Sequence, residues 1–400
     1  MLLASLLMAG FYLCLTQCVA ELAAACPPGD ADGMDSFAAV GLGHSGRFFA
    51  GISVATAVGV AAGIAASFID AYCTSVFGIG GTPLKLLLIA AFAGIQLRGA
   101  QEAVFLTVAG GSLAVIVLLY FCGVMAPSFS TSALYTNHNG VPTLFPHGTA
   151  GIVQCVPYAL FMFLGVEQAA NAAGEMHEPM KNLPKAIFTS TAAVLLIGLS
   201  VLVFAGGAGV EKVAAADGNP LFVAMMNSKH GLGRNWLATL IGAGSMTSLL
   251  ATAFSLFYAS SRQFFSLAKA GYLPRLMTKV NGKGAPTSAL WLVTGLATIG
   301  TQIDPNTVLV CFIFCLCVCN ALVLLSFLSA RAKHAGMVRP YRAIGGRFSA
   351  VAALILVALV LVACVQLQLA AIKYVAIGYF CCAAYYYALR TKRSALSGSK

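Results

Sequence analysis

Hydrophobic residues occur along this chain in long uninterrupted runs that are separated by short polar segments. An α-helix needs about 20 apolar residues to cross the hydrocarbon core of a bilayer. The runs lack the alternation that marks the strands of a membrane barrel, so helices are the predicted form. We predict eleven membrane-spanning helices, at residues 1–26, 47–75, 82–97, 100–126, 148–170, 185–206, 236–266, 286–302, 306–330, 348–369 and 371–389.

The composition excludes a soluble domain. Of the 400 residues, 60% are hydrophobic and 9% are charged, whereas soluble domains carry about 25% charged residues. The thirteen cysteines fall mainly within the apolar runs, where cysteine behaves as a small hydrophobic residue. Cys311, Cys315 and Cys319 share one helical face and are predicted to pack there. Neither a metal site, a cofactor site nor a catalytic motif is predicted, so an enzymatic function has no support.

Lys and Arg residues set the predicted orientation, because cytoplasmic loops of membrane proteins are enriched in them. If the loops after every odd-numbered span are cytoplasmic, most of the 23 Lys and Arg residues lie on that side. The C-terminal residues 390–400 then form a short cytoplasmic tail. An odd span count and an apolar start without Lys or Arg favour one further helix before residue 1. A genuine eleven-span protein is the alternative.

The fifth span is interrupted within the stretch FMFLGVEQAANAAGEMHEPMKNLPKA, residues 161–186. Gly165 weakens a helix, and a carboxylate such as that of Glu167 costs about 2.5–3.5 kcal/mol at the centre of a membrane helix. Together they predict a discontinuous helix, whose freed backbone groups can bind a polar solute. Alternatively, Glu167 lies at the cytoplasmic interface, on a solvated helix face with Asn171, Glu175 and Glu178.

Span 47–75 carries two further features that could be structural or functional. Asp70, near its outer end, could attract cations into a vestibule, but an interfacial cap is the favoured interpretation. Ala55, Gly59 and Gly63 recur at four-residue spacing, which allows two helices to approach closely. We therefore predict that this stripe is a packing surface.

Four stretches of the sequence resemble the amino acid–polyamine–organocation (APC) transporter superfamily. The first two are FLGVEQAANAAGEMHEPMKNLPKA at 163–186 and SRQFFSLAKAGYLPRLMTKVNGKGAP at 261–286. CVAELAAACP at 18–27 resembles the end of the family's second helix, and residues 97–129 resemble its fifth. Within the superfamily the likeness is greatest to ethanolamine and amino acid permeases.

The resemblance implies an all-α polytopic membrane protein with the inverted five-helix-repeat transporter fold. In that fold ten of twelve helices form two repeats, and substrate lies between the broken first and sixth helices. About eleven helices are present here, because residues 1–26 match the family's second helix and the first is absent. Residues 1–389 would form one transporter domain, with 1–126 as the remainder of the first repeat, 148–330 as the second, and 348–389 as two C-terminal helices.

The resemblance also implies a substrate site. Phe161 corresponds to an aromatic gate over the substrate, and Phe163, Leu164 and Gly165 to the unwound stretch of the sixth helix. Glu167 corresponds to the acid implicated in gating or in the response to protons. The span at 236–266 is expected to present three more residues to the site: Phe254, Ser255 and Tyr258.

The expected function is secondary active transport of ethanolamine or an amino acid by alternating access. The expected partners are this small substrate, a coupling proton or cation and the lipid bilayer of the plasma membrane, without nucleic acid. A general amino acid or polyamine permease of the same superfamily is the nearest alternative. A truncated, non-transporting sensor or remnant is the alternative from another functional class.

Overall fold

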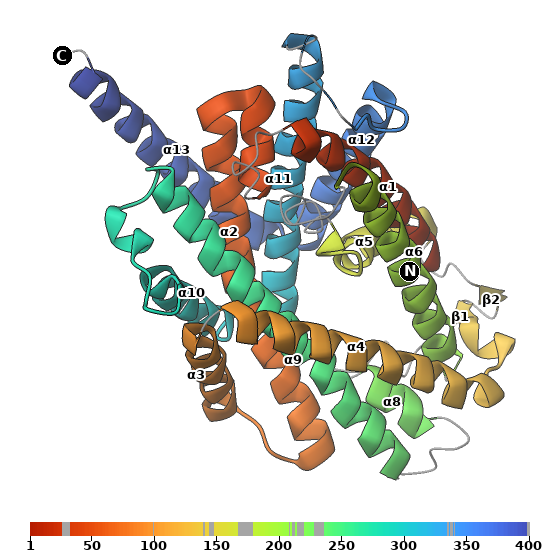
Figure 1. Cartoon of the computed structure of the whole chain (residues 1–400). Helices are drawn as coiled ribbons and strands as arrows, with labels where there is room; N and C mark the ends of the chain where they lie inside the picture. Colours follow the sequence, from red (N-terminus) through yellow and green to blue (C-terminus); the bar gives the residue numbers. More distant parts are fainter. Residues whose placement is uncertain are drawn as a thin grey trace.

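The computed structural model describes residues 1–25, 33–98, 100–138, 141–143, 148–166, 179–207, 209, 213, 220–227, 236–333, 336, 339 and 341–397. These residues are almost entirely helical (Figure 1). The α-helices are α1 (Leu2–Ala25), α2 (Met34–Phe77), α3 (Thr82–Arg98), α4 (Ala100–Met125), α5 (Gly148–Phe161), α6 (Pro179–Gly206), α8 (Pro220–Asn227), α9 (Trp236–Lys269), α10 (Thr287–Gly300), α11 (Pro305–Lys333), α12 (Arg347–Leu367) and α13 (Leu369–Ser397).

Each predicted span corresponds to one helix, which confirms the all-α polytopic fold. By length and composition, eight helices of the described chain could cross a membrane: α1, α2, α4, α6, α9, α11, α12 and α13. Helices α5 and α10 are shorter and apolar. Short 3₁₀ helices lie at Ala126–Ser128, Thr131–Leu134 and Arg275–Thr278, and strands β1 (Thr136–His138) and β2 (Val141–Thr143) pair antiparallel.

Helix α2 begins earlier than residue 47, where the sequence predicted it, because it contains a sharp turn. Gly43 has φ 64° and ψ −148°, and a backbone of this kind favours glycine. The helical segment before Gly43 therefore packs against the segment after it. A Cβ atom on Gly46 would overlap the carbonyl of Ala38. Apolarity alone does not distinguish this short returning segment from a loop.

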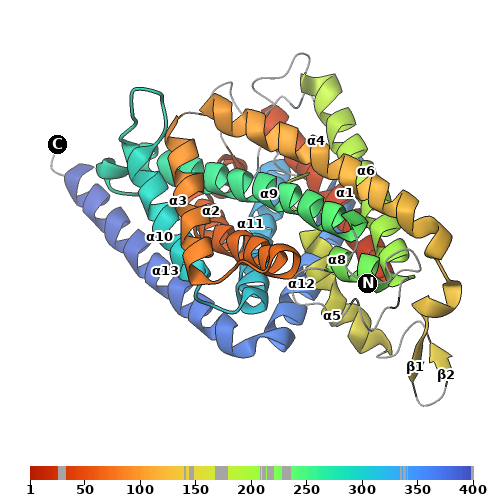
Figure 2. The ribbon, with the colours of Figure 1, turned by 90° about the horizontal axis from the view of Figure 1, so that it is seen from below.

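The helices enclose two main hydrophobic clusters. The first cluster holds residues of α1, α2, α5, α11 and α12, and the second holds residues of α2, α3, α9 and α10. Helix α2 contributes to both clusters and stands at the centre of the molecule beside α11. Helix α13 runs along the periphery, as the two perpendicular views in Figures 1 and 2 show.

Small residues allow α2 to approach α9 and α10 closely. A Cβ atom on Gly63 would overlap the carbonyl of Ala297, and one on Gly300 would overlap that of Val60. The Ser260 hydroxyl of α9 donates a 2.8 Å hydrogen bond to the Ala55 carbonyl oxygen. The predicted packing role of the small-residue stripe is therefore confirmed.

Asp70 fastens the end of α2 to the start of α3. Its Oδ1 accepts a 2.6 Å hydrogen bond from the backbone N–H of Gly81, and its Oδ2 lies 3.8 Å from Nζ of Lys85. The carboxylate thus closes the connection between the two helices. This confirms the interpretation of Asp70 as a cap.

Glu21 near the end of α1 is buried and binds two arginines. Its Oε1 lies 2.9 Å from Nε of Arg331 and 3.4 Å from Nε of Arg339, and its Oε2 accepts a 2.8 Å hydrogen bond from the backbone N–H of Ala343. Arg331 lies in the last turn of α11, and the other two residues precede α12. One carboxylate therefore joins α1 to the end of α11 and to the approach to α12.

Asp35 forms a second buried anchor at the start of α2. Its Oδ2 lies 3.1 Å from Nε of Arg47, beyond the Gly43 turn, and its Oδ1 accepts a 2.8 Å hydrogen bond from Nε2 of Gln263 in α9. Ser326 of α11 donates to the carbonyl of Phe37 in the same short segment, at 2.7 Å. The returning segment of α2 is therefore attached to α9 and α11.

Candidate functional site

The fifth predicted span loses its helical form at the predicted interruption. Helix α5 ends at Phe161, and the backbone N–H groups of Phe163 and Leu164 then bond to carbonyls three residues earlier, at 3.0 and 3.2 Å. Such bonds form tighter 3₁₀-type turns. Gly165 has φ 97°, which a residue with a side chain rarely adopts. Helix α5 therefore ends at residue 161, whereas the sequence predicted that the span would continue to residue 170. Glu167 lies outside the described residues.

The two phenylalanines at the end of α5 have different environments. Phe163 is fully buried and its ring stacks on Tyr12 of α1, with centroids 5.6 Å apart. Phe161 is half-buried and meets Phe312 of α11 edge to face at 6.3 Å. Leu164 is half-buried against the first cluster. Phe161 is thus the more accessible of the two rings, while Phe163 anchors the turn in the core. Tyr12 was not predicted, because nothing distinguishes it within its apolar run.

Phe254 of α9 lies in a different cluster from the residues at the end of α5. It is buried in the second cluster and meets Phe92 of α3 edge to face at 5.1 Å. Its backbone carbonyl accepts a 2.9 Å hydrogen bond from Nε2 of Gln96. The structure therefore does not group Phe254 with Phe161 and Phe163. Sequence spacing alone could not show which face of α9 turns toward α3.

A polar stripe runs along α9 on another face of the helix. We use this name for Ser248, Thr252, Ser255, Tyr258 and Arg262, which recur every three or four residues and so share one face. Thr252 and Arg262 are exposed and the other three are half-buried. The hydroxyl groups of the serines and the threonine donate to carbonyls of their own helix at 2.7–3.0 Å. Their oxygens keep acceptor capacity for water or a ligand.

The polar stripe lies at the boundary between the two hydrophobic clusters. Ala259, on one flank of the stripe, packs against the first cluster, and Phe257, on the other side of α9, belongs to the second. The turns after α5 belong to the first cluster. Ligand sites in helical proteins commonly form where packed bodies meet. The structure thus places the interrupted helix α5 in the first cluster and a polar face of α9 at the border of that cluster.

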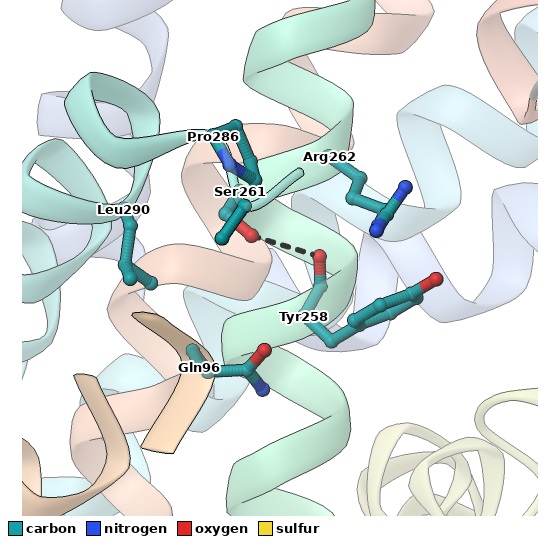
Figure 3. A pocket seen from close by; sticks show the side chains of 7 residues that line it. Gln96, Tyr258, Ser261, Arg262, Pro286 and Leu290 are labelled. Atoms are coloured by element: carbon teal, nitrogen blue, oxygen red, sulfur yellow. Dashed lines mark hydrogen bonds between the residues drawn. The ribbon is translucent and has the colours of Figure 1, made fainter. Parts of the chain in front are cut away.

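The stripe ends at a cation stacked on an aromatic ring. The Cζ atom of Arg262 lies 4.6 Å from the centroid of the Tyr258 ring. Figure 3 shows both side chains leaving α9 on the same side, away from Pro286 and Leu290. None of the acidic residues placed by the structure forms an ion pair with Arg262. Tyr258 was expected at the site from the family resemblance, whereas Arg262 was not.

A small pocket borders Tyr258 and Arg262 where α9 faces Gln96 of α3 and Leu290 of α10. Its volume is about 10 Å³, which is room for roughly one water molecule. The Ser261 hydroxyl in its wall donates to the Tyr258 carbonyl at 3.0 Å (Figure 3). The pocket is too small for an amino acid or ethanolamine. It is lined by Gln96, Tyr258, Ser261, Arg262, Ala285, Pro286 and Leu290.

The cysteines of α11 pack within the helix bundle. Cys319 is fully buried in the first cluster, and Cys315 is half-buried against it. In the part of the chain that the structure describes, no three His, Cys, Asp or Glu side chains are placed to hold a metal ion.

Comparison with known proteins assigns the chain to a family. The sequence model of the family described as "Amino acid permease" matches residues 1–383, which is nearly the whole chain. The protein belongs to the amino acid permease family. Its members are membrane transporters and not enzymes, in agreement with the apolar helices and the interrupted α5.

Several curated amino acid permeases resemble this chain. It is 26% identical to amino-acid permease RocC of Bacillus subtilis over 363 residues, which cover 86% of this chain and 74% of the relative. It is 28% identical to amino-acid permease AapA of B. subtilis over 247 residues, covering 58% of this chain and 52% of the relative. For the aromatic amino acid transport protein AroP of Escherichia coli O6:H1 the identity is 27% over 192 residues, 47% of this chain and 40% of the relative. In the last two cases the matched region spans about half of the relative or less.

Proposed function

We propose that this protein is a secondary transporter that carries an amino acid across the membrane by alternating access. The observation that carries the proposal is the interruption of α5 at Phe161 in a chain of the amino acid permease family. A broken membrane helix exposes backbone groups that can bind a polar solute within the bilayer. The polar stripe of α9 supports the proposal, because hydroxyl groups along one helix face can form hydrogen bonds with water and with a polar substrate along a hydrated transport path.

The two hydrophobic clusters support an alternating-access mechanism. Transporters of this kind move one packed body against another around a central substrate site. We propose that the polar stripe lines the path between the clusters, with Phe161, Ser255 and Tyr258 beside the substrate and Glu167 as the gating or proton-responsive acid. In this proposal residues 1–126 and 148–330 correspond to the two repeats, and the C-terminus lies in the cytoplasm of a plasma-membrane protein.

The substrate class is the part of the proposal with a close rival. The names of the relatives, two amino-acid permeases and an aromatic amino acid transport protein, favour an amino acid. The likeness of residues 124–129 and 261–274 to ethanolamine permeases favours ethanolamine. Both substrates carry an amino group, and only the amino acid carries a carboxylate. A comparison between the two compounds therefore identifies the group that the site recognises.

Uptake by the purified chain in proteoliposomes tests the proposal. We expect saturable uptake of labelled L-leucine or L-phenylalanine that excess unlabelled amino acid suppresses. Labelled ethanolamine, with unlabelled arginine, alanine and putrescine as competitors, separates the alternatives within the family. Absence of uptake for all of these compounds, with the protein correctly folded and inserted, would favour the non-transporting sensor.

The Glu167→Gln substitution tests the acid of the interrupted span. We expect uptake to fall by about tenfold or more, the effect of losing one charge-assisted hydrogen bond. Glu178→Gln, eleven residues further along, is the matched control and should leave uptake unchanged. Normal uptake by the Glu167→Gln variant would remove this carboxylate from the mechanism.

A further inference from the structure

The connection between α9 and α10, residues 270–286, is strongly basic and lies at the edge of the molecule (Figures 1 and 2). The sequence holds no Asp or Glu from residue 218 to residue 303, so no neighbour along the chain offsets the positive charges of the connection. One more cation ends α9 directly before it. We use the name basic surface for four exposed residues: Lys269, Arg275, Lys279 and Lys283.

Hydrogen bonds hold the backbone of this connection in place. The Asn281 side chain donates from Nδ2 to the carbonyl oxygen of Leu97 in α3, at 2.7 Å. Its Oδ1 accepts a 3.0 Å hydrogen bond from the backbone N–H of Lys283. The backbone N–H of Thr287 donates to the carbonyl of Lys279 at 3.1 Å. The cations therefore start from a fixed backbone, and this reduces the entropy that is lost when a ligand binds.

Two apolar side chains are exposed among these cations. Leu276 is 59% exposed and Val280 is 52% exposed. Each directly follows a cation, Arg275 or Lys279. Basic and apolar side chains together are typical of segments that lie at the boundary between lipid headgroups and acyl chains. A soluble anion would pair only with the cations, whereas a phospholipid offers both a charge and a hydrocarbon chain.

The ends of two helices place the connection at the level of the headgroups. Helix α9 is long and apolar enough to cross a membrane, and the connection begins directly after its last residue, Lys269. The Tyr385 hydroxyl of α13 donates a 3.0 Å hydrogen bond to the carbonyl oxygen of Tyr272 in the connection. Tyr387 on the same helix is 61% exposed. Tyrosines are enriched at the interface between a membrane and water, so α13 meets the connection at that depth.

We propose that the basic surface, together with Leu276 and Val280, binds a phospholipid that has an anionic headgroup. The cations donate charge-assisted hydrogen bonds to the phosphate oxygens, and the two apolar side chains pack against the start of the acyl chains. Clusters of about four to eight Lys and Arg residues beside a membrane helix are typical of binding to anionic lipids. The inference adds a lipid partner to the proposed transport function and does not depend on it.

The first experiment measures lipid retention by native mass spectrometry, on the chain in detergent with equal amounts of phosphatidylglycerol and phosphatidylcholine. We expect preferential retention of phosphatidylglycerol. The triple variant Arg275→Gln, Lys279→Gln, Lys283→Gln should bind this lipid more weakly by about fivefold for each cation removed. Equal retention of the two lipids by the unaltered chain, or no loss in the triple variant, would overturn the proposal.

A pair of single substitutions controls for net charge. Lys373 is exposed near the start of α13, at the other end of that helix from Tyr385. We expect Lys279→Gln to weaken phosphatidylglycerol binding by about fivefold and Lys373→Gln to leave it unchanged. Equal losses in the two variants would show that overall charge, and not the basic surface, attracts the lipid, and would overturn the proposal.

The double variant Leu276→Asn, Val280→Thr separates a lipid from a soluble phosphate compound. It keeps the size of both side chains and removes their apolar character. We expect it to weaken phosphatidylglycerol binding by about tenfold, and we expect excess glycerol 3-phosphate, which has no acyl chains, to leave the lipid in place. Displacement by glycerol 3-phosphate, with no effect of the double variant, would assign the surface to a soluble phosphate and overturn the proposal.

Photolabelling locates the lipid on the unaltered chain and so does not depend on the folding of any variant. Phosphatidylglycerol and phosphatidylcholine probes with a photoreactive group near the headgroup are compared in nanodiscs, and labelled peptides are identified by mass spectrometry. We expect the phosphatidylglycerol probe to label residues 270–286 more strongly. Equal labelling of this segment by the two probes would overturn the proposal. A chain that binds phosphatidylglycerol here but shows no uptake would refute the transport function and leave the lipid surface standing.

Discussion

Arginine has two different environments in two regions of this molecule. Near the ends of α1 and α11, Arg331 and Arg339 converge on the buried carboxylate of Glu21. On α9, Arg262 lies exposed over the ring of Tyr258 at the end of a polar stripe. Neutralising a buried carboxylate removes the counter-charge of the cations that it binds, whereas an exposed cation can be neutralised with little effect on packing. The difference separates residues that hold the helices together from an exposed residue that stacks on one ring.

The substitution Glu21→Gln should break the first region and have the largest effect. The amide keeps the shape of the side chain but removes the negative charge that Arg331 and Arg339 both bind, and only 21% and 13% of these two side chains are exposed. Breaking a buried ion pair in this way typically costs about 3–5 kcal/mol. We expect a marked fall in the thermal unfolding midpoint of the chain in detergent micelles. An unchanged midpoint would show that these arginines are satisfied by water.

The substitution Asp35→Asn should have an intermediate effect. Asp35 is fully buried, but Arg47 has 26% of its side chain exposed and can recover part of its hydration. The amide can still accept the hydrogen bond from Gln263. We expect a loss of about 2 kcal/mol, measured by the same thermal unfolding. A matched control is Asp70→Asn, because Asp70 is half-buried at the connection between α2 and α3 and its 3.8 Å ion pair with Lys85 is worth about 1 kcal/mol or less.

The substitution Arg262→Gln should have the smallest effect on stability. Its side chain is exposed and stacks on one ring, so we expect a change within about 0.5 kcal/mol. A large fall in the unfolding midpoint for Arg262→Gln would place this arginine with the structural ones and remove the contrast between the regions.

Helix positions were predictable from the sequence because the bilayer imposes them. A continuous apolar run of sufficient length has few alternatives to a membrane helix, and each predicted span corresponds to one helix. The sequence did not predict the helical segments whose existence depends on local backbone geometry or on short length. The short segment of α2 before Gly43 was missed because a single left-handed glycine reverses the chain there. Helix α8 was also missed, since its eight residues are too few to form a membrane run.

The candidate site was predictable in part. The interruption of the fifth span followed from Gly165 and Glu167, and the structure ends the helix at Phe161. The distribution of aromatic side chains did not follow. Phe163 turns into the core against Tyr12, and Phe254 packs against Phe92, because neighbouring helices decide which face of each segment is covered.

The amino-acid sequence by itself determined that this chain is a bundle of membrane helices with a break in the fifth span. Those properties depend on the transfer of local segments into lipid, and segment composition controls that transfer. Only the tertiary structure decided which charges are paired. Glu21 and Arg331 are 310 positions apart, and Asp35 and Gln263 are 228 apart. Contacts between such distant residues depend on how the helices pack, so the same packing left Arg262 on an accessible face of α9.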